Sequence, residues 1–86
     1  MSESVADVFL IRNRVVACVQ TTFLDTPHPE VHGHSRLVED LGMDSLHLIE
    51  LALALETEFD CEIADEEFEQ LRTVDEIVSF LARRSP

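Results

Sequence analysis

The stretch with the strongest chemical signal runs from Leu37 to Leu46 and reads LVEDLGMDSL. A glycine turn and an aspartate suited to the N-cap place Ser45 at the first position of a predicted helix. Backbone N–H groups in the first turn of a helix are unpaired and the helix dipole is positive there, so an attached phosphate is favoured. The sequence therefore predicts an exposed serine hydroxyl that can carry an anionic group.

Two other interpretations of Ser45 are open at this point. A catalytic serine needs a base within hydrogen-bond reach and a third group that orients the base. His47 lies two residues further on, so on a helix it points to a different side from Ser45. The surrounding residues also lack the G-x-S-x-G elbow of serine hydrolases. Alternatively, Ser45 is merely the first residue of a well-capped helix, and the residues alone do not decide between this and a modification site.

Four segments have the apolar periodicity of helices, and none has a convincing strand pattern. The helices are expected at about residues 4–21, 45–59, 65–70 and 74–83. Ser4 with Asp7, and Thr73 with Glu76, have the spacing of capping boxes. Short connections after the second helix favour a small up-and-down four-helix bundle. We therefore expect an all-α fold with three longer helices and one short one, in a single domain over residues 1–86.

A long connector, from about Thr22 to Met43, separates the first two helices. The side chains expected to hold it against the core are Phe23, Val31, Leu37, Val38 and Leu41. It also contains His28, His32 and His34. These histidines have neither a cysteine beside them nor a fixed helical spacing, so we do not expect a metal site.

The charge balance excludes several classes of partner. Eighteen acidic residues face six arginines and no lysine, which gives a net charge of −12. Nucleic acids and anionic membranes require a basic surface, so neither is expected as a partner. Proteins with basic patches are favoured.

No basic segment followed by an apolar one is visible near residue 1, so no signal peptide is expected. The longest apolar run, residues 51–55, is too short to span a bilayer. Cys18 and Cys61 fit no paired metal or redox spacing and are expected to be free, at least partly buried thiols. We therefore expect a cytoplasmic monomer. A chain of this length has little room for a deep catalytic cavity, which argues against an enzyme.

The motif around Ser45 resembles the signature of acyl carrier proteins. The matching residues are LGMDSL, with VED upstream and ELALALETEFDCEI downstream. The resemblance extends through DEE at 65–67 to TVDEI at 73–77. The first helix matches in pattern only. This resemblance implies that a phosphopantetheinyl transferase attaches 4′-phosphopantetheine from coenzyme A to Ser45, next to Asp44. The terminal thiol of the arm then holds acyl groups as thioesters, and the protein itself supplies no catalysis.

The resemblance also implies a role for the helix after Ser45, which in this family recognises partner enzymes by charge and apolar contact. The residues implicated are Leu46, His47, Ile49, Glu50, Leu53, Glu56 and Glu58. Complementary charge mainly accelerates association. We therefore expect that reversing Glu50 or Glu56 to arginine slows docking without loss of stability. His47 and Ala64 depart from the family pattern, which usually has an acid and a proline there.

The leading hypothesis is a carrier of fatty-acid or polyketide-type acyl intermediates, which it delivers to acyl-transferring and acyl-modifying enzymes with basic docking patches. The acid before the serine favours this kind of carrier over an aminoacyl or peptidyl carrier. An unmodified acidic helical adaptor is a third interpretation. The apolar faces of the helices are expected to enclose a core that opens toward the arm and takes in part of an acyl chain.

Overall fold

Four helices account for most of the computed structural model, which describes residues 5–23 and 30–84. Helix α1 spans Val5–Thr21, α2 spans Ser45–Phe59, α3 spans Asp65–Glu69 and α4 spans Val74–Arg84. Within the described residues the single β-type pairing is an isolated bridge between Arg36 and Thr73. The prediction of an all-α fold with three longer helices and one short one is confirmed. Ser4 and His28 lie outside the described residues.

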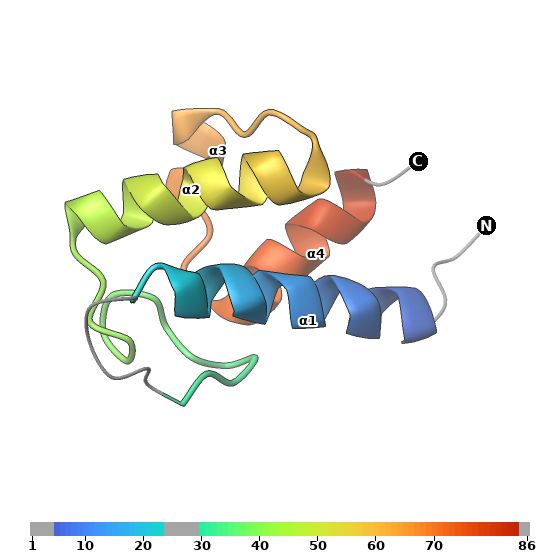
Figure 1. Cartoon of the computed structure of the whole chain (residues 1–86), viewed down its shortest axis with the longest axis horizontal. Helices are drawn as coiled ribbons and strands as arrows, with labels where there is room; N and C mark the ends of the chain where they lie inside the picture. The colour runs from blue at the N-terminus through green and yellow to red at the C-terminus, as the bar shows by residue number, and fades with distance from the viewer. Residues whose placement is uncertain (1–4, 24–29, 85–86) are drawn as a thin grey trace.

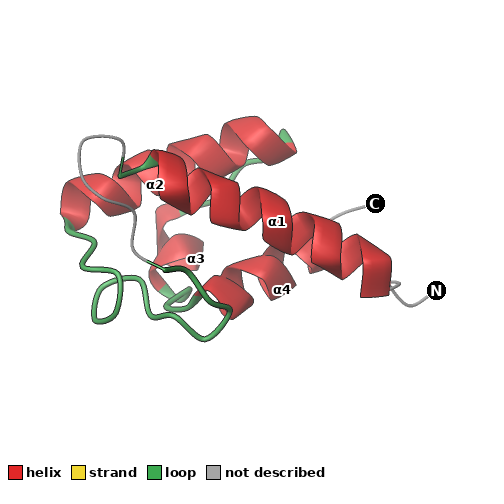
Figure 2. Ribbon diagram, turned by 60° about the horizontal axis from the view of Figure 1, so that its bottom comes forward, coloured by secondary structure: helices red, strands yellow, loops and turns green. Residues whose placement is uncertain are grey.

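The arrangement of the helices separates the start of α2 from the start of α1. In Figure 1, α1 and α2 run in opposite directions, and α4 crosses α1. The start of α1 and the end of α4 lie toward one end of the molecule, whereas the start of α2 lies at the other end. Figure 2 shows the same helices with the loop before α2 at the end where α2 begins. Ser45, the first residue of α2, therefore lies at the opposite end of the molecule from the start of α1 and the end of α4.

The hydrophobic core lies between α1, α2 and α4. The largest fully buried side chains are Val15, Val19, Leu37, Leu51, Leu55, Val74, Ile77 and Leu81. Helix α1 is rich in β-branched residues, whose helix propensity is mediocre, so packing of its buried face must hold it. Burying one such aliphatic side chain stabilises the fold by about 1.5–3 kcal/mol.

The loop before α2 is fixed to α4 by backbone hydrogen bonds. The N–H groups of Val74 and Asp75 donate to the carbonyl oxygens of Ser35 and Gly33, at 3.2 and 2.8 Å. Of the five side chains expected to hold the connector, Phe23, Leu37 and Leu41 are buried and Val31 is half-buried. The expectation was wrong for Val38, which is exposed.

Both cysteines are free, as expected, with Cys18 buried and Cys61 half-buried. Burial raises the pKa of each thiol, because an apolar environment disfavours the charged thiolate. Neither is therefore poised as a nucleophile. Within the described residues, no helix has both the length and the apolar character needed to cross a membrane.

Candidate functional site

Two residues, Gly42 and Met43, fix the turn before Ser45. Gly42 has a φ of 73°, a left-handed conformation that glycine adopts without steric cost. The next residue, Met43, is buried, and its N–H donates to the carbonyl oxygen of Leu37 at 3.0 Å. Ser45 itself is exposed at the first residue of α2. A buried anchor two residues earlier therefore presents this hydroxyl to solvent.

Asp44 caps α2, as its position predicted. Its carboxylate accepts the N–H of His47 at 2.9 Å, and this hydrogen bond lowers the pKa of Asp44. In return, Nδ1 of His47 lies 3.4 Å from the N–H of Asp44, which completes a capping box. Asp44 therefore has a structural role at the start of the helix, in addition to its place next to the serine.

The ring of His47 has an aromatic neighbour. It packs on Phe23, which follows α1, with the ring centroids 4.9 Å apart. Among the hydrogen bonds of residues 5–23 and 30–84, none joins Ser45 to His47 or to another base. The geometry therefore gives no support to a catalytic serine.

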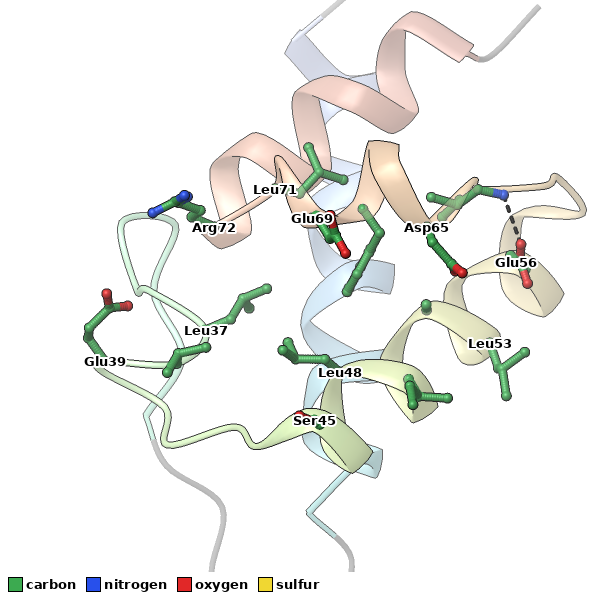
Figure 3. Close-up of a pocket in the computed structure, with 15 residues that line it drawn as sticks. Leu37, Glu39, Ser45, Leu48, Leu53, Glu56, Asp65, Glu69, Leu71 and Arg72 are labelled. Atoms are coloured by element: carbon green, nitrogen blue, oxygen red, sulfur yellow. Dashed lines mark hydrogen bonds between the residues drawn. The ribbon is translucent and has the colours of Figure 1, made fainter.

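An open pocket of about 630 Å³ begins at Ser45. Figure 3 shows it between α2, the loop that contains Leu37 and the segment that contains Leu71, with the side chain of Leu48 directed into it. Its apolar wall consists of Leu37, Val38, Leu48, Ile49, Ala52, Leu53, Ile63, Phe68 and Leu71. Its charged rim consists of Glu39, Glu56, Asp65, Glu69 and Arg72. An apolar group tethered to Ser45 would find apolar surface beside its attachment point.

Glu56 on this rim holds the wall of the pocket in place. Its carboxylate accepts the backbone N–H of Ile63 at 2.8 Å, shown as the dashed line in Figure 3. Ile63 belongs to the link between α2 and α3. Further along this link, the N–H of Ala64 donates to Glu67 at 3.1 Å, and Arg84 also pairs with Glu67, at 2.8 Å. The pairing with Arg84 lowers the pKa of Glu67.

The structure brings only part of the predicted docking set together. Leu46, Ile49 and Leu53 are 61%, 57% and 58% exposed on α2, and Ile49 and Leu53 also line the open pocket. Glu50 is also exposed, and among the described residues no hydrogen bond or ion pair involves its side chain. These four residues form what we call the outer face of α2.

The other three predicted docking residues have partners within the fold. Glu58 faces α1, where Arg14 donates to its carboxylate at 2.8 Å and to its carbonyl oxygen at 2.6 Å. Glu56 and His47 are half-buried and engaged as described above. The sequence held one signal for this: Asp44 and His47 have the three-residue spacing of a capping box. It held none for the contacts to Arg14 or Phe23, which come from distant parts of the chain.

The histidines of the loop form a separate, exposed group. The rings of His32 and His34 stack with centroids 5.3 Å apart, and His32 also pairs with Glu30 at 2.9 Å. The described residues contain no group of three side chains able to hold a metal ion.

Comparisons with known proteins show the family of this chain. The sequence matches the family described as the phosphopantetheine attachment site over residues 13–81. It is 44% identical to the acyl carrier protein of Bdellovibrio bacteriovorus over 55 residues, which cover 64% of this chain and 70% of that protein. It is 40% identical to the acyl carrier protein of Buchnera aphidicola from Acyrthosiphon pisum over 62 residues, which cover 72% and 78%.

A solved structure supports the same relationship. Rv0033 of Mycobacterium tuberculosis, assigned as an acyl carrier protein, superimposes with a TM-score of 0.77 at 28% identity. The match covers 87% of this chain and 99% of that one. The chain therefore belongs to the phosphopantetheine attachment family and is a non-catalytic, phosphopantetheine-bearing carrier of the acyl carrier protein kind.

Proposed function

We propose that this protein, as a single carrier domain over residues 1–86, carries fatty-acid or polyketide-type acyl intermediates as thioesters. The arm is attached to Ser45. The observation that carries the proposal is the position of this serine, exposed at the first residue of a capped helix and at one end of an apolar pocket. A cytoplasmic location and a monomeric state stay predictions.

The start of α2 suits an attached phosphate. In the transfer from coenzyme A, the oxygen of Ser45 bonds to the phosphorus of the phosphopantetheine group and the nucleotide part leaves. The first-turn N–H groups have no backbone partner within the helix, and the helix dipole is positive there. Asp44 stays occupied as the cap, because its carboxylate already accepts the N–H of His47.

The apolar pocket supports an acyl cargo. A chain attached through the arm could fold back against Leu48 and its neighbours in the wall. Each methylene taken from water contributes about 0.8 kcal/mol before the cost of ordering the chain. We therefore expect a medium-length acyl group to raise the melting temperature of the modified protein, and to do so more as the chain lengthens.

The outer face of α2 supports docking by two different forces. Leu46, Ile49 and Leu53 offer apolar contact, and Glu50 adds charge that a basic patch would complement. We expect the phosphopantetheinyl transferase and the acyl-processing enzymes to use this surface. Charge would mainly set how fast they associate, which suits a carrier that must also be released.

The test is intact mass after incubation with coenzyme A, Mg²⁺ and a broad-specificity phosphopantetheinyl transferase. The wild type should gain one phosphopantetheinyl group, and Ser45→Ala should gain none while it keeps the far-UV spectrum of the wild type. Modification that persists in Ser45→Ala would move the site elsewhere. If several transferases leave the wild type unmodified, Ser45 is not the attachment site in this chain. If acylated and unacylated forms melt together at every chain length, an aminoacyl cargo becomes the better proposal.

A further inference from the structure

His47 connects the start of α2 to the end of α1. Its side chain is 31% exposed. On one side, its ring packs on the buried Phe23, with the centroids 4.9 Å apart and the planes inclined at 35°. On the other side, its Nδ1 lies 3.4 Å from the backbone nitrogen of Asp44. One side chain therefore contacts both Asp44, the cap of α2, and Phe23, which lies two residues after the end of α1.

Two contacts of Nδ1 tie the ring of His47 to the cap of α2. This nitrogen lies 3.4 Å from the backbone nitrogen of Asp44 and 3.1 Å from a carboxylate oxygen of the same residue. The ring is therefore held at the start of α2 through both the main chain and the side chain of Asp44.

Ser45 depends on this arrangement because its own side chain has no hydrogen bond among the described residues. The direction of its hydroxyl follows the backbone of Asp44 and the first turn of α2. Asp44, which precedes the serine, and His47, two residues after it, form hydrogen bonds with each other. Group transfer is sensitive to such placement, since a misplacement of about 1 Å can cost about a hundredfold in rate.

We propose that His47 is a positioning residue for the modification of Ser45, which rests on the function proposed above. By accepting the N–H of Asp44 and packing on Phe23, it fixes the first turn of α2 against the end of α1. The hydroxyl of Ser45 is then presented to the transferase in a single orientation. Among the described residues, no ring contact or side-chain hydrogen bond joins His47 to Leu46, Ile49 or Leu53, so loss of His47 should leave apolar docking intact and slow the transfer itself.

Three variants separate the two contacts. His47→Gln keeps a side-chain acceptor at the capping-box position, where glutamine is common, but loses the ring. His47→Phe keeps a ring against Phe23 but loses the acceptor. His47→Ala loses both. The control is Thr73→Ala, which removes the equivalent cap of α4, where the hydroxyl of Thr73 accepts the N–H of Glu76 at 3.1 Å.

The measurement is the steady-state rate of phosphopantetheine transfer to the unmodified protein, well below the melting temperature of each variant. We expect His47→Ala to lower kcat about tenfold, the size expected for loss of such a bond, with KM within about twofold of the wild type. His47→Gln and His47→Phe should fall between, and Thr73→Ala should lose stability without losing kcat.

Several results would overturn the proposal. If all the His47 variants keep the kcat of the wild type, the contacts stabilise the fold and nothing more. A rise in KM that high salt abolishes, with kcat unchanged, would make His47 a docking residue instead. Failure of the wild type itself to gain the arm would remove the proposed function, whereas a modified wild type with unaffected variants removes this inference alone.

Discussion

Glu50 and Glu56 test which acidic side chains of α2 hold the fold together and which are left for partners. Glu56 accepts the partly buried N–H of Ile63 at 2.8 Å, whereas Glu50 is exposed on the outer face of α2. Hydrogen bonds to charged groups contribute about 1.5–3 kcal/mol, and leaving a buried N–H without an acceptor costs a similar amount. Glu56→Ala should therefore lower the free energy of unfolding by about 2 kcal/mol.

That loss is large enough to measure by thermal and urea unfolding. For a domain of this size, 1 kcal/mol corresponds to a change of about 4–8 °C in melting temperature. Glu56→Ala should therefore melt about 8–16 °C lower than the wild type. Glu50→Ala removes the same charge, so it controls for relief of self-repulsion, and it should stay within about 0.5 kcal/mol. Glu56→Gln keeps an acceptor oxygen and should fall between the two.

Equal melting temperatures for Glu50→Ala and Glu56→Ala would refute the structural role given to Glu56. The structure thus changes one expectation drawn from the sequence, that a reversal to arginine at either position leaves stability unharmed. At Glu56 the reversal would remove the acceptor for Ile63 and disturb the pocket wall. A slower reaction in Glu56→Arg would then not be evidence for docking.

Three further predictions concern the cap, the turn and the docking face. The lowered pKa of Asp44 means that its carboxylate stabilises the fold above an ordinary carboxyl pKa of about 3.9, and that this contribution is lost as the pH falls through the lowered value. The difference in unfolding free energy between wild type and Asp44→Asn should therefore shrink below about pH 4 in urea titrations; a constant difference would contradict this. Gly42→Ala should cost about 1 kcal/mol in the same assay, because a left-handed φ disfavours a Cβ even in open space, and Gly42→Asn should cost less. Glu50→Arg should partly slow the modification of Ser45 at low salt, with the deficit vanishing at high salt, whereas a deficit from Leu46→Ala should persist. Equal rates for Glu50→Arg and wild type at low salt would show that Glu50 contributes no charge to docking.

Local signals in the sequence predicted the helix starts well. Asp44 predicted that α2 begins at Ser45, and the Thr73–Glu76 box is present at α4, with both reciprocal bonds at 3.1 Å. Such signals succeed because the cap and the groups it satisfies are only three residues apart. The spacing of apolar residues along α4 also predicted which of its positions are buried, since one periodic face meets one core.

The sequence could not show what each polar side chain on a face would contact. Periodicity indicated that Glu58 lies on one side of α2, but its partner Arg14 comes from a helix 44 residues earlier. Nothing in the sequence indicated that Phe23 would lie against the ring of His47, whose role in docking stays a prediction. Val38 was placed against the core because it is apolar, yet it is exposed at the pocket. Long-range packing decided all three.

The contacts divide the acidic residues into two groups with different consequences for partner binding. Asp40, Asp44, Glu56, Glu58, Glu67, Asp75 and Glu76 accept hydrogen bonds from N–H groups or arginines of this chain. Among the described residues, no hydrogen bond or ion pair involves the side chains of Glu39, Glu50, Asp60, Glu62, Asp65, Glu66 or Glu69.

The unengaged acids lie mostly outside α2. Of that group only Glu50 belongs to α2, whereas three belong to α3 and two to the link before it. A basic partner would therefore meet its strongest attraction on the side of α3 and its apolar contact on the outer face of α2. Exposed charges act over about a Debye length, about 8 Å at physiological salt, so neighbouring acids share the effect. Any one reversal should consequently slow association only partly, and the electrostatics of docking should belong to the combined surface of α2 and α3 rather than to the serine's helix alone.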